Sequence, residues 1–513
     1  MAGRLRGDPT CVAVLACALV GAPSGLPDVE RLLAVPAPAL RGLGGRLSAI
    51  GLGGPFLARL ARVGDQLDDP WRAPMRIWNA RRMKEPAAVV ARLFMLHDVV
   101  SVRDVEAALG DMGVLRDAGL VEEAPGGVSS RFHLAFAAGA HCFGDRPGAA
   151  GDAVLPICGA TLDLVRASLA RDAVEAALDI GCGAGLVSLL FARSARRVVA
   201  TDLSPRAVAF ARVNLSIQGV SNVEVRCGDL FDTVRGERFD RIAAQPPFVA
   251  LRAGAPSVTF THGGARGDEL AKRLLSGITP HLAPGGRAVV LADWPIIEGD
   301  PLDARLREAL GDASADLLVL QSPAKNLDAY CVQYAGVEHP ELGEAFTQAA
   351  IAQRDHLESM GIRGVAIAVA VVEAAAPPPG WTSLLSVRHG ADAPIYAETV
   401  DRMVGVRRLA HAGVEAMRRA CLRFPQGARA VEQQLPDGAP PAMVVQLPST
   451  CPEWPVVVDA ASAAIVRRLS EAATAFDVAR ALADESGTSI EAAWPNVEAA
   501  ARDALLRGAL RIA

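Results

Sequence analysis

The sequence predicts an α/β protein built around a doubly wound parallel sheet. Between residues 150 and 340, strand-like and helical stretches alternate, as they do when crossover helices connect parallel strands. Within this region, the run from Leu178 to Leu186 reads L-D-I-G-C-G-A-G-L, a strand followed by a glycine turn and a helix. Asp202 ends the next apolar run, at the spacing of a ribose-binding carboxylate. The region is therefore predicted to bind a nucleotide-like ligand.

The glycine turn carries the main part of this prediction. Gly181, Gly183 and Gly185 lack the Cβ atoms that would keep a ligand away from the backbone. The following helix adds free N–H groups and the positive end of its dipole. Asp179 precedes the first glycine, where dinucleotide-binding folds usually have a glycine or an apolar residue. A turn of the NAD-binding kind is the alternative left open.

Four segments resemble class I S-adenosylmethionine (SAM) methyltransferases, in the same order along the chain. D-x-G-x-G-x-G and V-V-A-T-D are similar to motifs I and II, 223–230 to the third strand, and 239–248 to the fourth strand with its N-P-P-Y/F motif. Residues 263–270 resemble the G-G-x-x-G-x-x-L segment of small-domain methyltransferases, a group that includes glutamine and RNA-guanine N-methyltransferases. The resemblance covers roughly residues 150–375. It implies an enzyme with a seven-stranded Rossmann-like methyltransferase sheet and SAM as its cofactor.

The resemblance also implies which residues hold SAM. Asp202 would accept hydrogen bonds from the ribose hydroxyls, and Asp229 from the adenine amino group. Asp179 would complement the methionine amino group or order the loop. The full set expected at the cofactor is Asp179, Gly181, Gly183, Gly185, Asp202, Leu203, Asp229, Leu230 and Gln245.

The acceptor motif departs from the family at its first residue. In N-P-P-Y/F enzymes the Asn oxygen and the next carbonyl accept hydrogen bonds from a planar NH₂, and the aromatic ring stacks on the acceptor. Here Gln245 replaces Asn, which adds about 1.5 Å of reach. Three other interpretations of the motif remain open. The acceptor could be shifted or smaller, it could be an oxygen or carbon nucleophile, or the motif could merely be a rigid loop after the strand. With His262 in the following loop as a possible base, the expected catalytic set is Gln245, Pro246, Pro247, Phe248 and His262.

Composition limits the partners. The chain has 513 residues and a net charge of −5, and its pI of about 6.0 argues against a protein that stays bound to nucleic acid. Nine cysteines without a C-x-x-C pair indicate reduced thiols in the cytoplasm and no metal site. The apolar run at 10–21 is too short to span a bilayer, and we expect a buried helix there, with no membrane partner.

Four segments are expected. Residues 1–148 form an N-terminal helical, winged-helix-like cap domain, whose acidic third helix favours substrate capping or dimerisation over DNA binding. Residues 149–375 form the methyltransferase domain, in which strands at 316–321 and 329–335 pair at the sheet edge. A connecting region at 376–440 leads to a small helical C-terminal module at 441–513, which resembles peptide-binding modules found with peptide-modifying enzymes.

The sequence therefore predicts a cytoplasmic SAM-dependent methyltransferase. The expected acceptor is a nitrogen or oxygen of a small molecule, in natural-product biosynthesis (secondary metabolism). A peptide acceptor is possible, nucleic acid is disfavoured, and the chain could form a homodimer. The alternatives are a peptide, protein or RNA N-methyltransferase, a non-catalytic SAM-binding regulator, and an enzyme that uses SAM itself as substrate.

Overall fold

The computed structural model describes most of the chain. The described residues are 25–61, 73–147, 149, 151–155, 157–169, 172–255, 260–311, 314–339, 342–375, 380–388, 394–434 and 441–513. The apolar run at 10–21, for which a buried helix is expected, lies outside them. The chain divides into two compact units, one of Met1–Asp316 with Ala324–Gly380 and one of Leu317–Pro323 with Trp381–Ala513. The division into four segments stays a prediction.

The central element is a mixed sheet of eight strands in the order β14-β12-β13-β11-β8-β5-β6-β7. The α/β class is confirmed, whereas the expected count of seven strands is wrong because β14, a short run of Ser, Thr and Leu, pairs parallel with β12. The strand bounds are β5 Val174–Ile180, β6 Ala195–Asp202, β7 Val223–Cys227, β8 Phe239–Ala244, β11 Leu282–Ile297, β12 Ala315–Gln321, β13 Ile362–Ala374 and β14 Thr382–Ser386.

Helices connect these strands as the alternation predicts. They are α9 Gly159–Ser168, α10 Leu186–Phe191, α11 Pro205–Ile217, α12 Glu269–Ile278 and α13 Leu302–Leu310. The start of α11 shows why the helices begin where they do. Ser204 accepts a hydrogen bond from the Ala207 N–H, and Pro205 occupies the first helical position, where its missing N–H has no cost.

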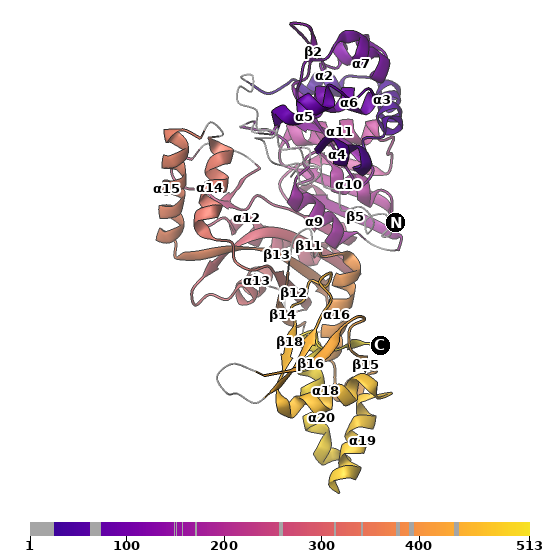
Figure 1. Cartoon of the computed structure of the whole chain (residues 1–513), viewed down its shortest axis with the longest axis vertical. Helices are drawn as coiled ribbons and strands as arrows, with labels where there is room; N and C mark the ends of the chain where they lie inside the picture. Colours follow the sequence, from indigo (N-terminus) through magenta and orange to yellow (C-terminus); the bar gives the residue numbers. More distant parts are fainter. Residues whose placement is uncertain are drawn as a thin grey trace. The chain divides into compact units, whose positions relative to one another are not determined.

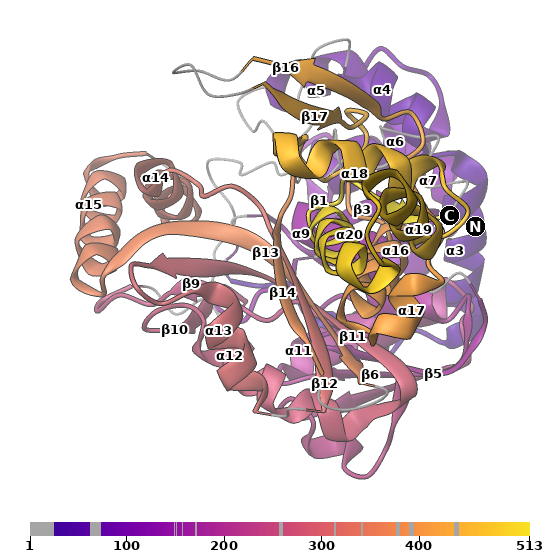
Figure 2. The same cartoon turned by 90° about the horizontal axis from the view of Figure 1, so that it is seen from below.

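One expected strand, 329–335, is wrong: the segment belongs to helix α14 (Leu327–Glu338). Asn326 caps this helix by accepting the N–H groups of Asp328 and Ala329, and its buried residues follow helical spacing. The antiparallel strand of this part of the sheet is instead β13, which pairs with β11 and follows a further helix, α15 (Glu344–Ser359). Helices α14 and α15 lie side by side as a hairpin (Figures 1 and 2).

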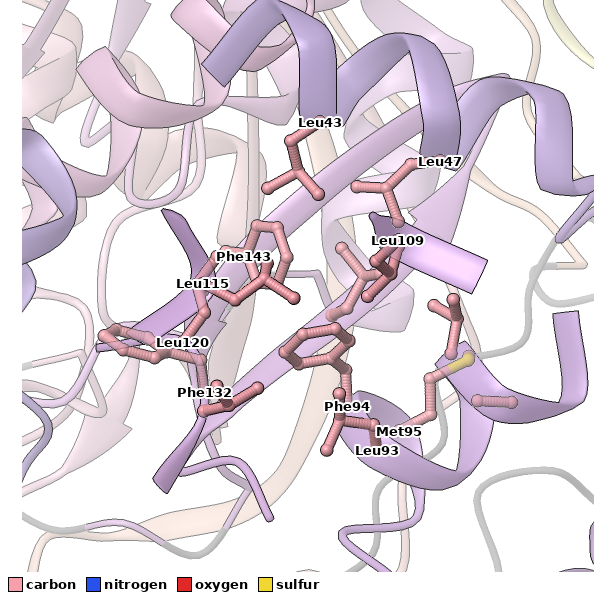
Figure 3. Close-up of a cluster of buried hydrophobic side chains, with 14 of the residues drawn as sticks. Leu43, Leu47, Leu93, Phe94, Met95, Leu109, Leu115, Leu120, Phe132 and Phe143 are labelled. Atoms are coloured by element: carbon pink, nitrogen blue, oxygen red, sulfur yellow. The ribbon is translucent and has the colours of Figure 1, made fainter. Parts of the chain in front are cut away.

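The N-terminal helices share a hydrophobic core with the methyltransferase region. Figure 3 shows the centre of this core, where Phe94 meets Phe143 edge-on with ring centroids 5.2 Å apart. Phe132 packs in the same way on Phe210 of α11, at 6.0 Å. The elements are α2 Val29–Leu33, α3 Ala37–Ile50, α4 Gly54–Ala61, α5 Ala73–Ala80, α6 Pro86–Val90, η2 Ala91–Met95, α7 Val102–Leu109, α8 Met112–Asp117, β1 Glu122–Ala124, β2 Gly127–Ser129, β3 Phe132–Ala137 and β4 Ala140–Asp145.

The second unit has its own core and well-capped helices. Thr474 and Asp477 form a capping box at the start of α19, and Gly487 ends it in the left-handed conformation. The elements are α16 Ala397–His411, α17 Val414–Arg418, β15 Leu422–Arg423, β16 Arg429–Gln433, β17 Ala442–Gln446, β18 Val456–Val458, α18 Ala460–Glu471, α19 Ala475–Ser486, α20 Ile490–Leu506 and β19 Arg511–Ile512. In the described part of the chain, no helix has the length and apolar character needed to cross a membrane.

Candidate cofactor and acceptor site

Strand register places the two predicted motifs next to each other. Ile180 of β5 pairs with Thr201 of β6 on one side and with Ala244 of β8 on the other. The next residue of each strand is therefore Gly181, Asp202 or Gln245, at the carboxyl edge of three adjacent parallel strands. This edge is where open α/β sheets bind their ligands.

The Asp202 carboxylate is hydrogen-bonded to the glycine turn. Its Oδ2 accepts a hydrogen bond from the Gly183 N–H at 2.9 Å, and its Oδ1 accepts one from the Ser204 N–H at 2.9 Å. Burial raises the pKa of Asp202, and these two backbone bonds oppose that shift. The carboxylate expected at the ribose is therefore fixed beside the turn that is expected to hold the same ligand.

The glycine turn leaves room over its backbone. Gly181 and Gly183 have φ of 70° and 52°, a region that favours glycine. A Cβ at either position would meet no heavy atom of the described residues within 4 Å, so it would project into open space beside Asp202. A Cβ at Gly185 would instead lie 3.3 Å from Ala211 of α11. The first two glycines fit a SAM-binding surface, and the third fits close helix packing.

Asp179 lies beneath the turn and orders it. The side chain is only 2% exposed, and its Oδ2 accepts hydrogen bonds from the Ser188 N–H and hydroxyl, at 2.9 and 2.5 Å. Burial raises the pKa of Asp179 to about 7, and the neighbouring Asp202 adds to the shift. Of its two expected roles, loop ordering is the one that these contacts support.

The remaining residues expected at the cofactor lie just after β6 and just after β7. Leu203 is 63% exposed at the carboxyl edge of β6, and Leu230 has a positive φ of 44°. Asp229 pairs with Arg273 of α12 through its Oδ2. Since this oxygen already accepts from a guanidinium, the contact of Asp229 with the adenine amino group stays a prediction.

Gln245 is held by two side chains that the sequence analysis missed. Its Oε1 accepts a hydrogen bond from the Thr161 hydroxyl at 3.2 Å, and its Nε2 donates to the Cys158 sulfur at 3.7 Å. Both residues belong to the start of α9, 84 and 87 residues earlier in the chain. No local sequence pattern signals such a contact, because Thr161 and Cys158 stand in an unremarkable helix start.

The glycine-rich segment after the acceptor motif packs on the backbone of that motif. Short strands β9 (Val249–Ala250) and β10 (His262–Gly264) pair in parallel, with His262 opposite Val249. A Cβ at Gly267 would lie 2.5 Å from the Phe248 carbonyl oxygen, and one at Gly263 would lie 2.5 Å from that of Pro247. Glycine is therefore required at both positions so that this segment can support the Q-P-P-F loop.

Helices α14 and α15 contact the segment that follows this loop. Gln353 donates to the Ala250 carbonyl at 3.0 Å, Glu338 pairs with Arg252, and His356 contacts the Ala265 carbonyl at 2.7 Å. Just before α14, Lys325 pairs at 2.7 Å with Asp293 of β11, whose side chain is only 3% exposed. Burial and then the Asp293 carboxylate raise the pKa of the Tyr334 hydroxyl. This helical hairpin thus restrains the chain that follows the acceptor motif.

Two basic side chains near helix α5 also have partners. Just after α5, Arg81 pairs with Asp98 at 2.5 Å, and the Arg82 guanidinium lies 3.6 Å from the Trp78 ring centroid. Among the described residues, no group of three or more His, Cys, Asp or Glu side chains could hold a metal ion.

Comparison with known proteins agrees with the fold and the cofactor motifs. Residues 160–296 match the family described as methyltransferase small domain. Release factor glutamine methyltransferase of Cereibacter sphaeroides is 36% identical over 171 residues, covering 31% of this chain and 59% of that protein. Ribosomal RNA small subunit methyltransferase C of Escherichia coli (strain K12 / DH10B) is 35% identical over 129 residues, covering 25% and 33%.

The matches are partial on both sides. Release factor glutamine methyltransferase of Xylella fastidiosa (strain Temecula1 / ATCC 700964) is 34% identical over 128 residues, covering 23% of this chain and 46% of that protein. Among solved structures, N-methyltransferase NodS from Bradyrhizobium japonicum with S-adenosylhomocysteine is 17% identical, covering 42% of this chain and 84% of that one, with a TM-score of 0.24. The chain thus spans about half, or less, of the length of most of these curated relatives.

The sheet, the glycine turn and the acceptor motif define a class I SAM-dependent methyltransferase domain. More narrowly, residues 160–296 match the methyltransferase small domain family. The resemblance stated from the motifs is confirmed, as is SAM as the cofactor of this family of enzymes.

The expectation of a small-molecule acceptor in secondary metabolism is wrong. The relatives are named for a release factor glutamine and for ribosomal RNA, which are macromolecular acceptors. The motifs could not reveal this, because they contain the residues that bind the cofactor and the acceptor nitrogen. They do not indicate whether that nitrogen belongs to a small molecule, a protein or a nucleic acid. Nor does the net charge of −5 exclude such partners, since it averages over the whole chain.

Proposed function

We propose that this chain is a SAM-dependent N-methyltransferase whose acceptor is the side-chain amide of a glutamine in a protein. The observation that carries the proposal is the shared register that aligns Gly181, Asp202 and Gln245 at one sheet edge. Support for a protein acceptor comes from the relatives, since one that is covered over 59% of its length is a release factor glutamine methyltransferase.

The residues of the chain account for binding and orientation. Bound SAM supplies a methyl group already activated by the sulfonium, so the protein mainly orients the nucleophile and excludes water. Asp202 would hold the ribose. Gly181 and Gly183, which lack side chains, would let the rest of the ligand lie against the backbone of the turn. The Gln245 carboxamide oxygen would accept one N–H of the acceptor amide. As the N–C bond forms and the S–C bond breaks, the nitrogen loses its proton, and His262 is the candidate to receive it.

The other parts of the chain would serve this reaction. The helices and hairpins before residue 148 would form a winged-helix-like cap, and the second unit would end in a small helical module. A cytoplasmic location is supported by the free cysteines among the described residues and by relatives that act on the translation machinery.

The test is transfer of labelled methyl from SAM to a purified peptide-chain release factor and, separately, to small-subunit ribosomal RNA. Label on the release factor, lost with Asp202→Asn and kept with Asp503→Asn, supports the proposal. Asp503 is a matched control because it is exposed and pairs only with Arg507 among the described residues. Label on the RNA alone, or on neither acceptor while SAM binds, would overturn the protein assignment.

A further inference from the structure

Gln245 poses a specific problem for the proposed function, on which this inference rests. A Gln side chain has one more rotatable bond than Asn, so its carboxamide is harder to hold in one orientation. Transfer to a planar nitrogen requires that the hydrogen-bond acceptor be fixed, since small errors in placement strongly reduce the rate. The structure should therefore contain something that restrains this side chain.

The restraint is a triangle of three side chains. Thr161 donates its hydroxyl to the Gln245 Oε1 at 3.2 Å, the Gln245 Nε2 donates to the Cys158 Sγ at 3.7 Å, and the Cys158 Sγ lies 3.1 Å from the Thr161 Oγ1. Both ends of the carboxamide are thus engaged. Because a carbonyl oxygen accepts two hydrogen bonds, one lone pair of Oε1 stays available for an acceptor N–H.

The first residue of this restraint, Cys158, lacks the usual hydrogen bond between an N-cap side chain and the helix backbone. Cys158 occupies the N-cap of α9, where Ser, Thr, Asp or Asn usually satisfies a free backbone N–H. Its side chain makes no capping bond and contacts Gln245 and Thr161 instead. Since α9 also packs on β8 and β11, the restraint is anchored to the same sheet that carries Gln245.

We infer that Thr161 and Cys158 are positioning residues that hold the Gln245 carboxamide in one orientation, so that the longer Gln serves a planar nitrogen acceptor as Asn does. A held carboxamide is a hydrogen-bond acceptor and not a base. It can therefore orient an N–H of a planar amide, while any proton that the acceptor loses must go to another group.

The kinetic test uses the labelled-methyl assay with the release factor as acceptor. Thr161→Val should lower kcat about tenfold and leave the KM for the release factor and the affinity for SAM within about twofold, because one net hydrogen bond is worth roughly that factor. Thr161→Ser should restore kcat. The matched control is Thr347→Val in α15, whose hydroxyl donates only to the Gly343 carbonyl among the described residues and should not matter.

The deciding comparison is made in a Gln245→Asn background. Asn is too short to reach Thr161, so adding Thr161→Val to Gln245→Asn should change kcat by less than about twofold. An equal loss in both backgrounds would overturn the inference while leaving the proposed function intact.

A second readout works whether or not the release factor is methylated. Crystal structures of the wild-type chain and of Thr161→Val show where the carboxamide lies. A Gln245 amide that turns away in the variant supports the restraint, and an unchanged amide overturns it. A wild-type enzyme that binds SAM but does not label the release factor contradicts only the proposed function, and the structures then decide the inference alone.

Discussion

The cofactor half and the acceptor half of this site are held together in different ways. The contacts that order the cofactor half lie within residues 179–204, where backbone N–H groups donate to Asp202 and Ser188 donates to Asp179. The acceptor half is held by side chains distant in sequence, including Thr161 on α9 and Gln353 on α15. A short motif can specify the first half, whereas the second depends on the whole fold.

The largest effect should come from breaking the cofactor half at Asp202. Asp202→Asn removes the charge that the Gly183 and Ser204 N–H groups and the ribose would share, and hydrogen bonds to charged groups are the strong ones. We expect SAM affinity to fall about 100-fold, or roughly 3 kcal/mol, by calorimetry. An affinity equal to that of Asp503→Asn would show that residue 202 does not hold the ribose.

Asp179 should make the cofactor half sensitive to pH. Its pKa is raised to about 7 in the folded protein by burial, against about 3.9 in an unfolded chain. The folded state therefore binds this proton more tightly, and the stability that it contributes is present below about pH 4 and lost as the pH rises through about 7.

Asp179→Asn should remove that dependence. The Asn oxygen can still accept from Ser188, so the variant should lose less stability than the wild type between about pH 4 and 7, by on the order of a few kcal/mol. Urea unfolding at several pH values measures the slope, with Asp503→Asn keeping the wild-type slope. Parallel curves for wild type and Asp179→Asn would refute this assignment.

A smaller effect, confined to the acceptor half, should follow Gly267→Ala. The new Cβ would lie 2.5 Å from the Phe248 carbonyl oxygen, so the Q-P-P-F loop must shift. We expect kcat to fall roughly tenfold with SAM affinity unchanged. Gly254→Ala is the matched control, since Gly254 also has a positive φ, 76°, but a Cβ there meets open space among the described residues. Equal losses in the two variants would mean that backbone strain alone matters.

What the sequence could predict follows the same division. The glycine turn, Asp202 and the strands from 174 to 244 were predictable because each is encoded within a few residues by spacing and hydrophobicity. Residues 329–335 misled the analysis, since Tyr, Cys and Val suit a strand, while the cap at Asn326 and packing against Ala250 and Ile362 select a helix. The roles of Thr161 and Cys158 could not be predicted, because they exist only once α9 lies against β8.

The common level at which β5, β6 and β8 end also limits how this enzyme can evolve. Neighbouring strands are about 4.8 Å apart, and β5 lies between β6 and β8, so the distance from Asp202 to Gln245 is set by two strand spacings of the sheet. One inserted residue in β8 would turn position 245 to the opposite face and abolish the alignment. Changes in substrate preference should therefore accumulate in α9 and the α14–α15 hairpin, while the separation of Asp202 and Gln245 stays the same.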